Sequence, residues 1–286
     1  MSQQTAIAGL DVAAARARYP AAFAVNWRAR TIGAIVVAAM LAAYAGALTF
    51  FDVPWGRLGP GLKQLGWFVA DMVPPDAGGH FPTYINALGE TLAISLLGTL
   101  LGALMAFPLG ILAARNVVPM AILRLPIKRL FDAVRGIDIL IWALIWINVV
   151  GLGPFAGVLA IAVSDFGSLG KLFAEIIESA DRKPVDGVKA SGGRRLAEAR
   201  FGLLPQVLPV MTGQVLYFIE SNTRAATVIG IVGAGGIGLD LAEQIRVLEW
   251  RQVAFLILLI LIAVAAIDFV SGHLRAAIAG RRRRTN

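Results

Sequence analysis

The sequence predicts an all-α integral membrane protein with about six transmembrane helices, on the evidence of its composition, its apolar runs and its charge distribution. Hydrophobic residues make up 58% of the 286 residues and charged residues only 15%, against about 25% charged residues in soluble domains. The mean hydropathy is +0.74. A soluble chain of this length could not hide so much apolar surface from water, which excludes a soluble enzyme, a disordered chain and a secreted scaffold. The sequence has no cysteine, so disulfides and thiolate metal sites are excluded too.

The first part of the chain is expected to hold one span and one external helix. Residues 1–30 contain no short apolar stretch followed by a cleavage site, so we expect a cytoplasmic arm there. Residues 31–51 form an uncharged run that is long enough to cross the membrane, which takes about 20 residues. Residues 52–82 would then be an external loop. Apolar side chains at helical spacing between Pro60 and Val73 predict a short helix on the membrane surface in that loop.

The predicted transmembrane core covers residues 83–274 and is followed by a basic cytoplasmic tail, residues 275–286. Apolar runs predict its five spans at residues 91–114, 133–150, 155–177, 201–219 and 252–274. Gly151–Pro154 is interpreted as a tight external turn between two of them. With that turn, 21 of the 26 Lys and Arg residues lie on the cytoplasmic side, whereas a five-span chain would place 12 there. Basic residues concentrate on the cytoplasmic side, so the count favours six spans with both termini inside.

The basic residues therefore mark an anionic membrane surface, and we expect membrane lipid and no nucleic acid as a partner of the run Arg281–Arg284. No motif for catalysis occurs: HExxH, GxSxG and the phosphate-binding loop of ATPases are all absent. The two histidines, His80 and His273, do not assemble a metal site. We expect no catalytic residue, no metal and no cofactor bound by this chain.

A glycine-rich segment at residues 233–238 matches the pattern GxGxxG, which is found in dinucleotide-binding proteins. Such a site requires a strand, a helix and a second strand, whereas a transmembrane helix follows here. We interpret the segment as a place near the outer surface where backbone approaches backbone or a passing solute. Its candidate pathway or gate residues are Gly233, Gly235, Gly236 and Gly238.

The largest cytoplasmic loop, residues 182–205, is the most informative stretch. Pro184 suits the first turn of a helix and Gly192 its end, so a helix of about two turns is predicted at Val185–Ser191. Val185 and Val188 share one face of this helix. A helix so short is marginal in water, and either the rest of the chain or the groove of a partner must hold it.

This loop resembles the EAA loop of permease subunits of bacterial ABC importers. The glycine and the Leu-Pro pair of that motif match Gly192, Leu204 and Pro205 in type and spacing. The front half departs from the pattern, because Asp186 replaces the usual glutamate and Gly187 and Val188 replace the alanines. Gly202 stands where the family has isoleucine. Residues 220–245 are similar to the phosphonate-transport branch of the family, and the resemblance covers roughly residues 83–271.

The resemblance implies a type I ABC importer permease in the bacterial inner membrane. A second permease copy would complete the pathway, and two cytoplasmic ATPases would bind ATP and magnesium. A periplasmic or surface-tethered binding protein would deliver phosphonate, phosphite or hypophosphite. The coupling helix would be Pro184–Ser191, with its valines in a groove of the ATPase. The residues implied in coupling are Pro184, Val185, Asp186, Val188, Lys189, Gly192, Leu204 and Pro205.

Ionisable groups at membrane depth indicate function or internal pairing. Glu220 and Arg224 are four residues apart and are expected to neutralise each other, while a role of Arg224 in the passage of an anion stays open. Asn222 is an uncharged pathway candidate. The acidic residues Asp138, Asp165 and Asp268 are expected to face partners or helix ends.

Two other functions remain open, a permease for another small solute and an ion-coupled secondary transporter. The latter predicts inverted repeats with matched broken helices. The two halves of this sequence have no convincing similarity of that kind.

Overall fold

The computed structural model describes residues 27–51 and 55–283, and within these ranges the regular structure is helical. The chain divides into two units, residues 1–66 and 67–286. Most of the predicted arm, residues 1–30, lies outside the described residues, as do the last three residues of the predicted tail.

The first unit contains α4 (Trp27–Phe50) and the beginning of α5 (Trp55–Asp71). Apolar side chains cover α4 on all sides, and Ile35, Met40 and Tyr44 are exposed. A helix that is apolar all round suits hydrocarbon, and α4 is a candidate span at the predicted position. The helix expected in the following loop is also present, although it begins before Pro60 and continues through it. Its position on the membrane surface stays a prediction.

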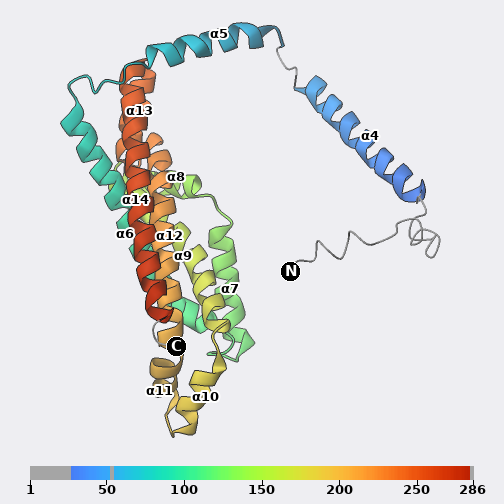
Figure 1. The fold of residues 1–286 in the computed structure, drawn as a ribbon, viewed down its shortest axis with the longest axis vertical. Helices are drawn as coiled ribbons and strands as arrows, with labels where there is room; N and C mark the ends of the chain where they lie inside the picture. The colour runs from blue at the N-terminus through green and yellow to red at the C-terminus, as the bar shows by residue number, and fades with distance from the viewer. Residues whose placement is uncertain (1–26, 52–54, 284–286) are drawn as a thin grey trace, which may run out of the picture. The chain divides into compact units, whose positions relative to one another are not determined.

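The second unit is a helical core with one polar projection (Figure 1). Its elements are α6 (Phe81–Ala113), α7 (Ala121–Arg135), α8 (Ile139–Val150), α9 (Pro154–Glu178), α10 (Arg182–Ala190), α11 (Arg195–Ala197), the π-helix η1 (Glu198–Leu203), α12 (Leu204–Ile231), α13 (Ile237–Arg246) and α14 (Trp250–Arg283). Together with α4, the part of the chain that is described has five helices long and apolar enough to span a membrane, or up to six if the bent pair α7–α8 counts as one span.

Small residues bring α6 and α9 into close contact. A Cβ atom at Gly98 would lie 2.7 Å from Ile161 Cβ, and one at Gly102 would lie 2.8 Å from the Ala162 carbonyl oxygen. A Cβ atom at Gly110 would likewise lie 2.9 Å from Phe173 Cβ. Helices in lipid associate through such small-residue stripes because these let the backbones approach. Helices α6 and α9 therefore form the tightly packed centre of the core.

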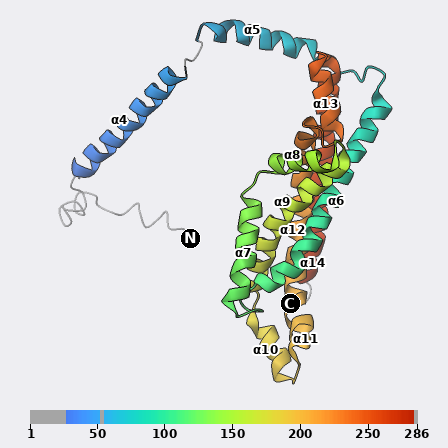
Figure 2. The same cartoon turned by 180° about the vertical axis from the view of Figure 1, so that it is seen from behind.

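The predicted third span, residues 133–150, is wrong as a single helix. The structure breaks it into α7 and α8, which bend by 88° (Figure 2). The cause is local: α7 ends at Gly136, and the Asp138 carboxylate caps α8 by accepting a hydrogen bond from the Leu140 amide at 2.9 Å. Asp138 thus lies at a helix end, as expected. The turn predicted at Gly151–Pro154 is present between α8 and α9.

Two predicted spans are longer in the structure than in the sequence prediction. Helix α12 continues to Ile231 instead of ending near residue 219. Helix α14 runs from Trp250 to Arg283 and so includes most of the predicted tail, residues 275–286. In α14 the residues after 274 are mostly alanine and arginine, which are good helix formers, and they include no proline; Gly280 does not end the helix.

Candidate functional site

Helix α10 and the turn after it form a projection at one end of the core (Figure 1). The Asp181 carboxylate caps the helix by accepting from the Lys183 amide at 3.0 Å, so α10 begins before Pro184. Gly192 ends it with φ = +84°, a left-handed conformation that disfavours side chains. The short helix predicted from Pro184 and Gly192 is confirmed.

The valine face of α10 packs against its own chain. A Cβ atom at Gly202 in η1 would lie 2.8 Å from Val185 Cα, and one at Gly193 would lie 2.7 Å from Val188 Cγ1. Both valines are half-buried by these contacts. Both valines keep part of their surface exposed, so the expectation that they pack in a groove of an ATPase stays a prediction. The exposed face is polar and consists of Arg182, Lys183, Pro184, Asp186, Gly187 and Lys189.

Gln206 joins α10 to α12. Its Nε2 donates to the Asp181 carbonyl oxygen at 3.1 Å and to the Gly202 carbonyl oxygen at 2.6 Å, and its Oε1 accepts from the Asp181 amide at 3.1 Å. The bonds connect the N-terminus of α10 to the first turn of α12, where Leu204 and Pro205 lie. Helix α10, η1 and α12 are thereby braced into one unit. A cavity of about 420 Å³ beside this brace is lined in part by Asn116, Asp186 and Arg195.

The glycine-rich segment lies between α12 and α13 at the other end of α12. Gly233, Gly235 and Gly236 have φ values of +103°, +82° and +74°, which glycine adopts without strain. Hydrogen bonds hold the segment on two neighbours: the Gly153 amide donates to the Gly233 carbonyl oxygen at 3.0 Å, and the Gly236 amide donates to Glu90 Oε1 at 3.2 Å. The close backbone approach is as predicted, but the segment is an internal turn.

The start of α13 fixes this turn to α6 and α12. The Ile237 amide donates to Thr91 Oγ1 at 2.8 Å, and Gly238 packs against the Thr227 carbonyl oxygen. Farther along α13, burial together with the charges of Glu243 and Glu90 raises the pKa of Asp240. Motion of α12 would therefore reach the turn and α13 directly.

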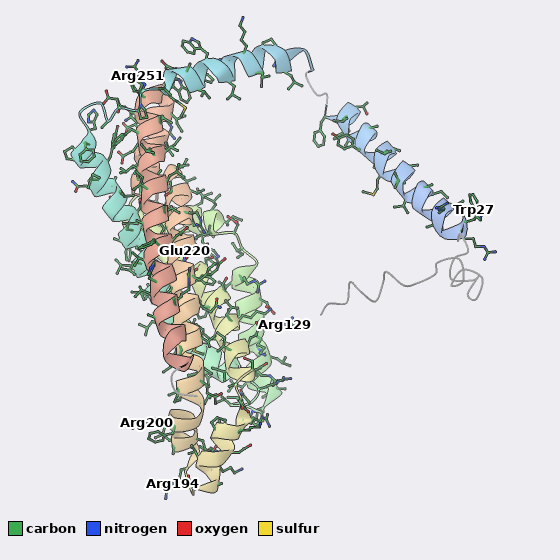
Figure 3. The ribbon with its side chains drawn as sticks, viewed as in Figure 1. Trp27, Arg129, Arg194, Arg200, Glu220 and Arg251 are labelled. Carbon is green, nitrogen blue, oxygen red and sulfur yellow. The ribbon has the colours of Figure 1, made fainter. Side chains whose placement is uncertain are left out.

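The expected pairing of Glu220 with Arg224 is wrong, because each side chain forms an ion pair with a residue of α14 instead. Glu220 Oε2 lies 2.8 Å from Arg275 Nη1, and Arg224 Nη1 lies 3.8 Å from Asp268 Oδ1. Spacing along one helix predicts only local partners, whereas α14 offers closer ones. Asp268 faces a partner, as expected. Figure 3 shows Glu220 between the two ends of the core, with Arg251 at one end and Arg194 and Arg200 at the other.

Asn222 is buried between α6 and α9. Its Nδ2 donates to Asp165 Oδ2 at 2.6 Å and to Thr99 Oγ1 at 2.7 Å. One helical turn away from Thr99, Ser95 Oγ lies 3.3 Å from Thr223 Oγ1. Asp165 faces a partner, as expected. These contacts make Asn222 a junction of three spans, and it does not face an open passage in this conformation.

Sequence reasoning missed several residues that shape the site. Gln206 and the Gly202–Val185 contact had no recognisable signal, because Gly202 looked like a departure from the motif. Asp165 had a signal, since an acid inside an apolar span is costly unless it is partnered. That signal did not identify Asn222 and Thr99 as the partners.

Apolar spans with a polar helix braced to one of them are the arrangement expected of a permease subunit of an ABC importer. The chain belongs to a family described as binding-protein-dependent transport system inner membrane component, whose model matches residues 106–284. It is a multi-pass membrane protein, consistent with its apolar helices.

Two of the named relatives come from Stutzerimonas stutzeri. The chain is 39% identical to the permease protein HtxC, named for a phosphite transport system, over 81% of this chain and 82% of the relative. It is 36% identical to the phosphite transport system permease protein PtxC over 75% of this chain and 78% of that relative.

Among solved structures, the fold is similar to that of a chain of the MetNI methionine ABC transporter in an inward-facing conformation. The TM-score is 0.64 at 19% identity, over 71% of this chain and 99% of the other. This likeness confirms the type I ABC importer permease fold.

Proposed function

We propose that this chain is the membrane permease subunit of an ATP-driven importer of a phosphorus oxyanion, with phosphite and phosphonate as the leading cargoes. The observation that carries the proposal is the similarity to two permease proteins named for phosphite transport, each over three quarters of this chain or more. The braced loop at α10 supports the coupling part of the proposal.

The α10 end is cytoplasmic in this proposal, and both termini lie on that side. The basic side chains around α10 and η1 support this orientation under the positive-inside rule, and they include Arg182, Lys183, Lys189, Arg194 and Arg195. The α13 end then faces the binding protein. ATP and magnesium belong to two partner ATPases, and this chain contributes no catalytic residue. A second copy of the chain is the simplest closed arrangement for the pathway.

Coupling follows from the connections of α12. Each ATPase engages the polar face of α10 that remains exposed, including Asp186 and Lys189. When the ATPases close, α10 moves with η1 because Gln206 and the Gly202 contact join them. Helix α12 then carries the motion to the glycine-rich turn.

The glycine-rich turn is the proposed gate of the α13 end. Gly233, Gly235, Gly236 and Gly238 adopt conformations or contacts that leave no room for side chains. Such a turn changes its backbone angles at low cost, so displacement of α12 opens or closes this end. The position of the segment supports gating, because it joins α12 to α13 and is held by hydrogen bonds from the Gly153 amide and to the Glu90 carboxylate.

Reconstitution tests the proposed function. The chain, its ATPase and its binding protein are placed in proteoliposomes, and uptake of phosphite, methylphosphonate and phosphate is measured with and without ATP. We expect ATP-dependent uptake of at least one of these anions. Uptake that needs an ion gradient and no ATP would overturn the proposal in favour of a secondary transporter, and ATP-driven uptake of an unrelated solute alone would overturn the cargo assignment.

A further inference from the structure

Four charged side chains lie along the seam between α12 and α14, at the level of the membrane-spanning residues. Both helices qualify as spans over this region, residues 195–231 and 250–278. The charges form two ion pairs, Glu220 with Arg275 and Arg224 with Asp268. Charged groups at this depth face the protein interior, a partner or water, because hydrocarbon does not solvate them.

The two pairs differ in closeness and shelter. The Glu220–Arg275 pair is a hydrogen bond at 2.8 Å, and the Glu220 side chain is 13% exposed. The Arg224–Asp268 pair is 3.8 Å apart, beyond hydrogen-bond length, and its side chains are 51% and 46% exposed. The first pair is a strut between two helices. In the second, the guanidinium is only loosely engaged and is open on one side.

A cavity lies farther along the same seam, beside Arg275 of the first pair. It has a volume of about 550 Å³ and is lined by Gln214 and Tyr217 of α12 and by Arg275 of α14, together with apolar neighbours. Tyr217 and Arg224 are seven residues apart, so they lie on one face of α12, two turns from each other. Tyr217 is 51% exposed. From Arg224 toward the α10 end, this face of α12 therefore presents a guanidinium, the Glu220 carboxylate paired with Arg275, a phenol and an amide.

The guanidinium of Arg224 is suited to bind an oxyanion. An arginine has five donors in a planar fork that fits the oxygens of a tetrahedral anion, and such bonds are among the stronger ones in proteins. Asp268 presents carboxylate oxygens to the same fork. A carboxylate and a phosphorus oxyanion therefore compete for the same donors.

We propose that Arg224 is a contact for the transported oxyanion and that Asp268 is an internal counter-ion, which holds the guanidinium loosely until cargo displaces it. The inference rests on the proposed function and deepens it by naming the cargo contact. Tyr217 and Gln214 then receive the anion on the way to the α10 end.

The test compares Arg224→Gln with Asp268→Asn in the complete transporter in proteoliposomes, with loaded binding protein present. Phosphite uptake per ATP hydrolysed is measured for each. Arg224→Gln is expected to lower this ratio about tenfold or more, the effect of losing one charge-assisted hydrogen bond. Asp268→Asn is expected to raise the ratio, because it removes the competitor. Opposite changes in phosphite uptake per ATP indicate a cargo contact. If the pair only joined the two helices, both variants would lower this ratio equally.

Two further variants complete the test. The exchange Arg224→Asp with Asp268→Arg keeps an ion pair but moves the cation to α14, and we expect it not to restore uptake. Restoration, or equal losses in the two single variants, would overturn the inference and identify a strut. Asp132→Asn is the matched control, because it breaks an ion pair with Lys171 of similar exposure between α7 and α9.

Failure of the inference is separable from failure of the proposed function. If the unmodified transporter takes up phosphite with ATP and Arg224→Gln does so equally well, only the inference fails. If the unmodified transporter takes up no phosphorus oxyanion, the proposed function fails.

Discussion

Replacing Asn222 by leucine is expected to weaken the core at the junction of α6, α9 and α12. The Asn222 side chain makes two bonds, to Asp165 at 2.6 Å and to Thr99 at 2.7 Å, and these partners are 3% and 0% exposed. Water cannot replace a lost bond at such a site. The substitution therefore leaves an acidic side chain short of a donor and a hydroxyl short of a partner.

The size of the effect follows from the partners. A bond to a charged group contributes about 1.5 to 3 kcal/mol and a neutral one about 1 kcal/mol, whereas interhelical bonds in membranes average about 0.6 kcal/mol. Both partners are buried, and leaving a buried polar group without its partner costs about 1 to 3 kcal/mol, so the larger figures apply. We expect Asn222→Leu to lower the free energy of unfolding by about 2 to 4 kcal/mol.

The double variant Asp165→Leu with Asn222→Leu provides the decisive comparison. Removing both polar partners costs less than leaving one of them unpaired, so the double variant is expected to be more stable than the sum of the two single effects. Steric trapping in bicelles measures each free energy of unfolding. Strict additivity, or a loss in Asn222→Leu within about 0.5 kcal/mol of zero, the range typical of surface substitutions, would refute the reasoning.

Three further substitutions address packing and coupling. Gly202→Val would push Val185 and α10 away from η1, and we expect ATP hydrolysis to continue while uptake per ATP falls. Gly192→Val would place a β-branched residue at φ = +84°, which costs about 1 to 2 kcal/mol and should abolish uptake while the protein stays in the membrane. Gly170→Leu would collide with the Phe131 ring, and the amount of folded protein in membranes should fall severalfold.

Gly89→Ala is the control for these glycine variants, because a Cβ atom at this α6 position meets no atom within 4 Å. It should leave uptake and protein level unchanged. Normal coupling in Gly202→Val would show that α10 does not need its contact with η1. Unchanged transport in Gly192→Val would count against the coupling role of the loop, and normal folding of Gly170→Leu would contradict the packing of α7 on α9.

Most of the helices were predictable because the length of an apolar run and the residues that begin or end a helix are local signals. The uncharged runs identified the membrane spans, and Gly151–Pro154 identified the turn before α9. Pro184 and Gly192 identified the short helix in the loop in the same way. The bend between α7 and α8 was not predicted, because Gly136 and Asp138 follow a charged stretch and were assigned to the start of the predicted span at residues 133–150.

The side-chain partners were less predictable because they come from distant parts of the chain. Glu220 bonds to a residue 55 positions away, whereas sequence spacing could suggest only Arg224. The polar junction of Asn222 requires three helices to meet at one level. Close contacts such as Gly202 with Val185 depend on how segments fold back on each other. A glycine in a sequence does not show whether close packing or a turn requires it.

Cysteine accessibility tests the central claim, that α10 lies in the cytoplasm and is bound by an ATPase. The chain has no cysteine, so Lys189→Cys and Leu248→Cys each add a single thiol at an exposed position of α10 and of the turn between α13 and α14. A membrane-impermeant thiol reagent is applied to intact cells and to inverted vesicles. We expect Lys189→Cys to react only in inverted vesicles and to be protected by the bound ATPase, and Leu248→Cys to react only in intact cells. Reaction of Lys189→Cys from outside, or equal reaction with and without the ATPase, would contradict the account.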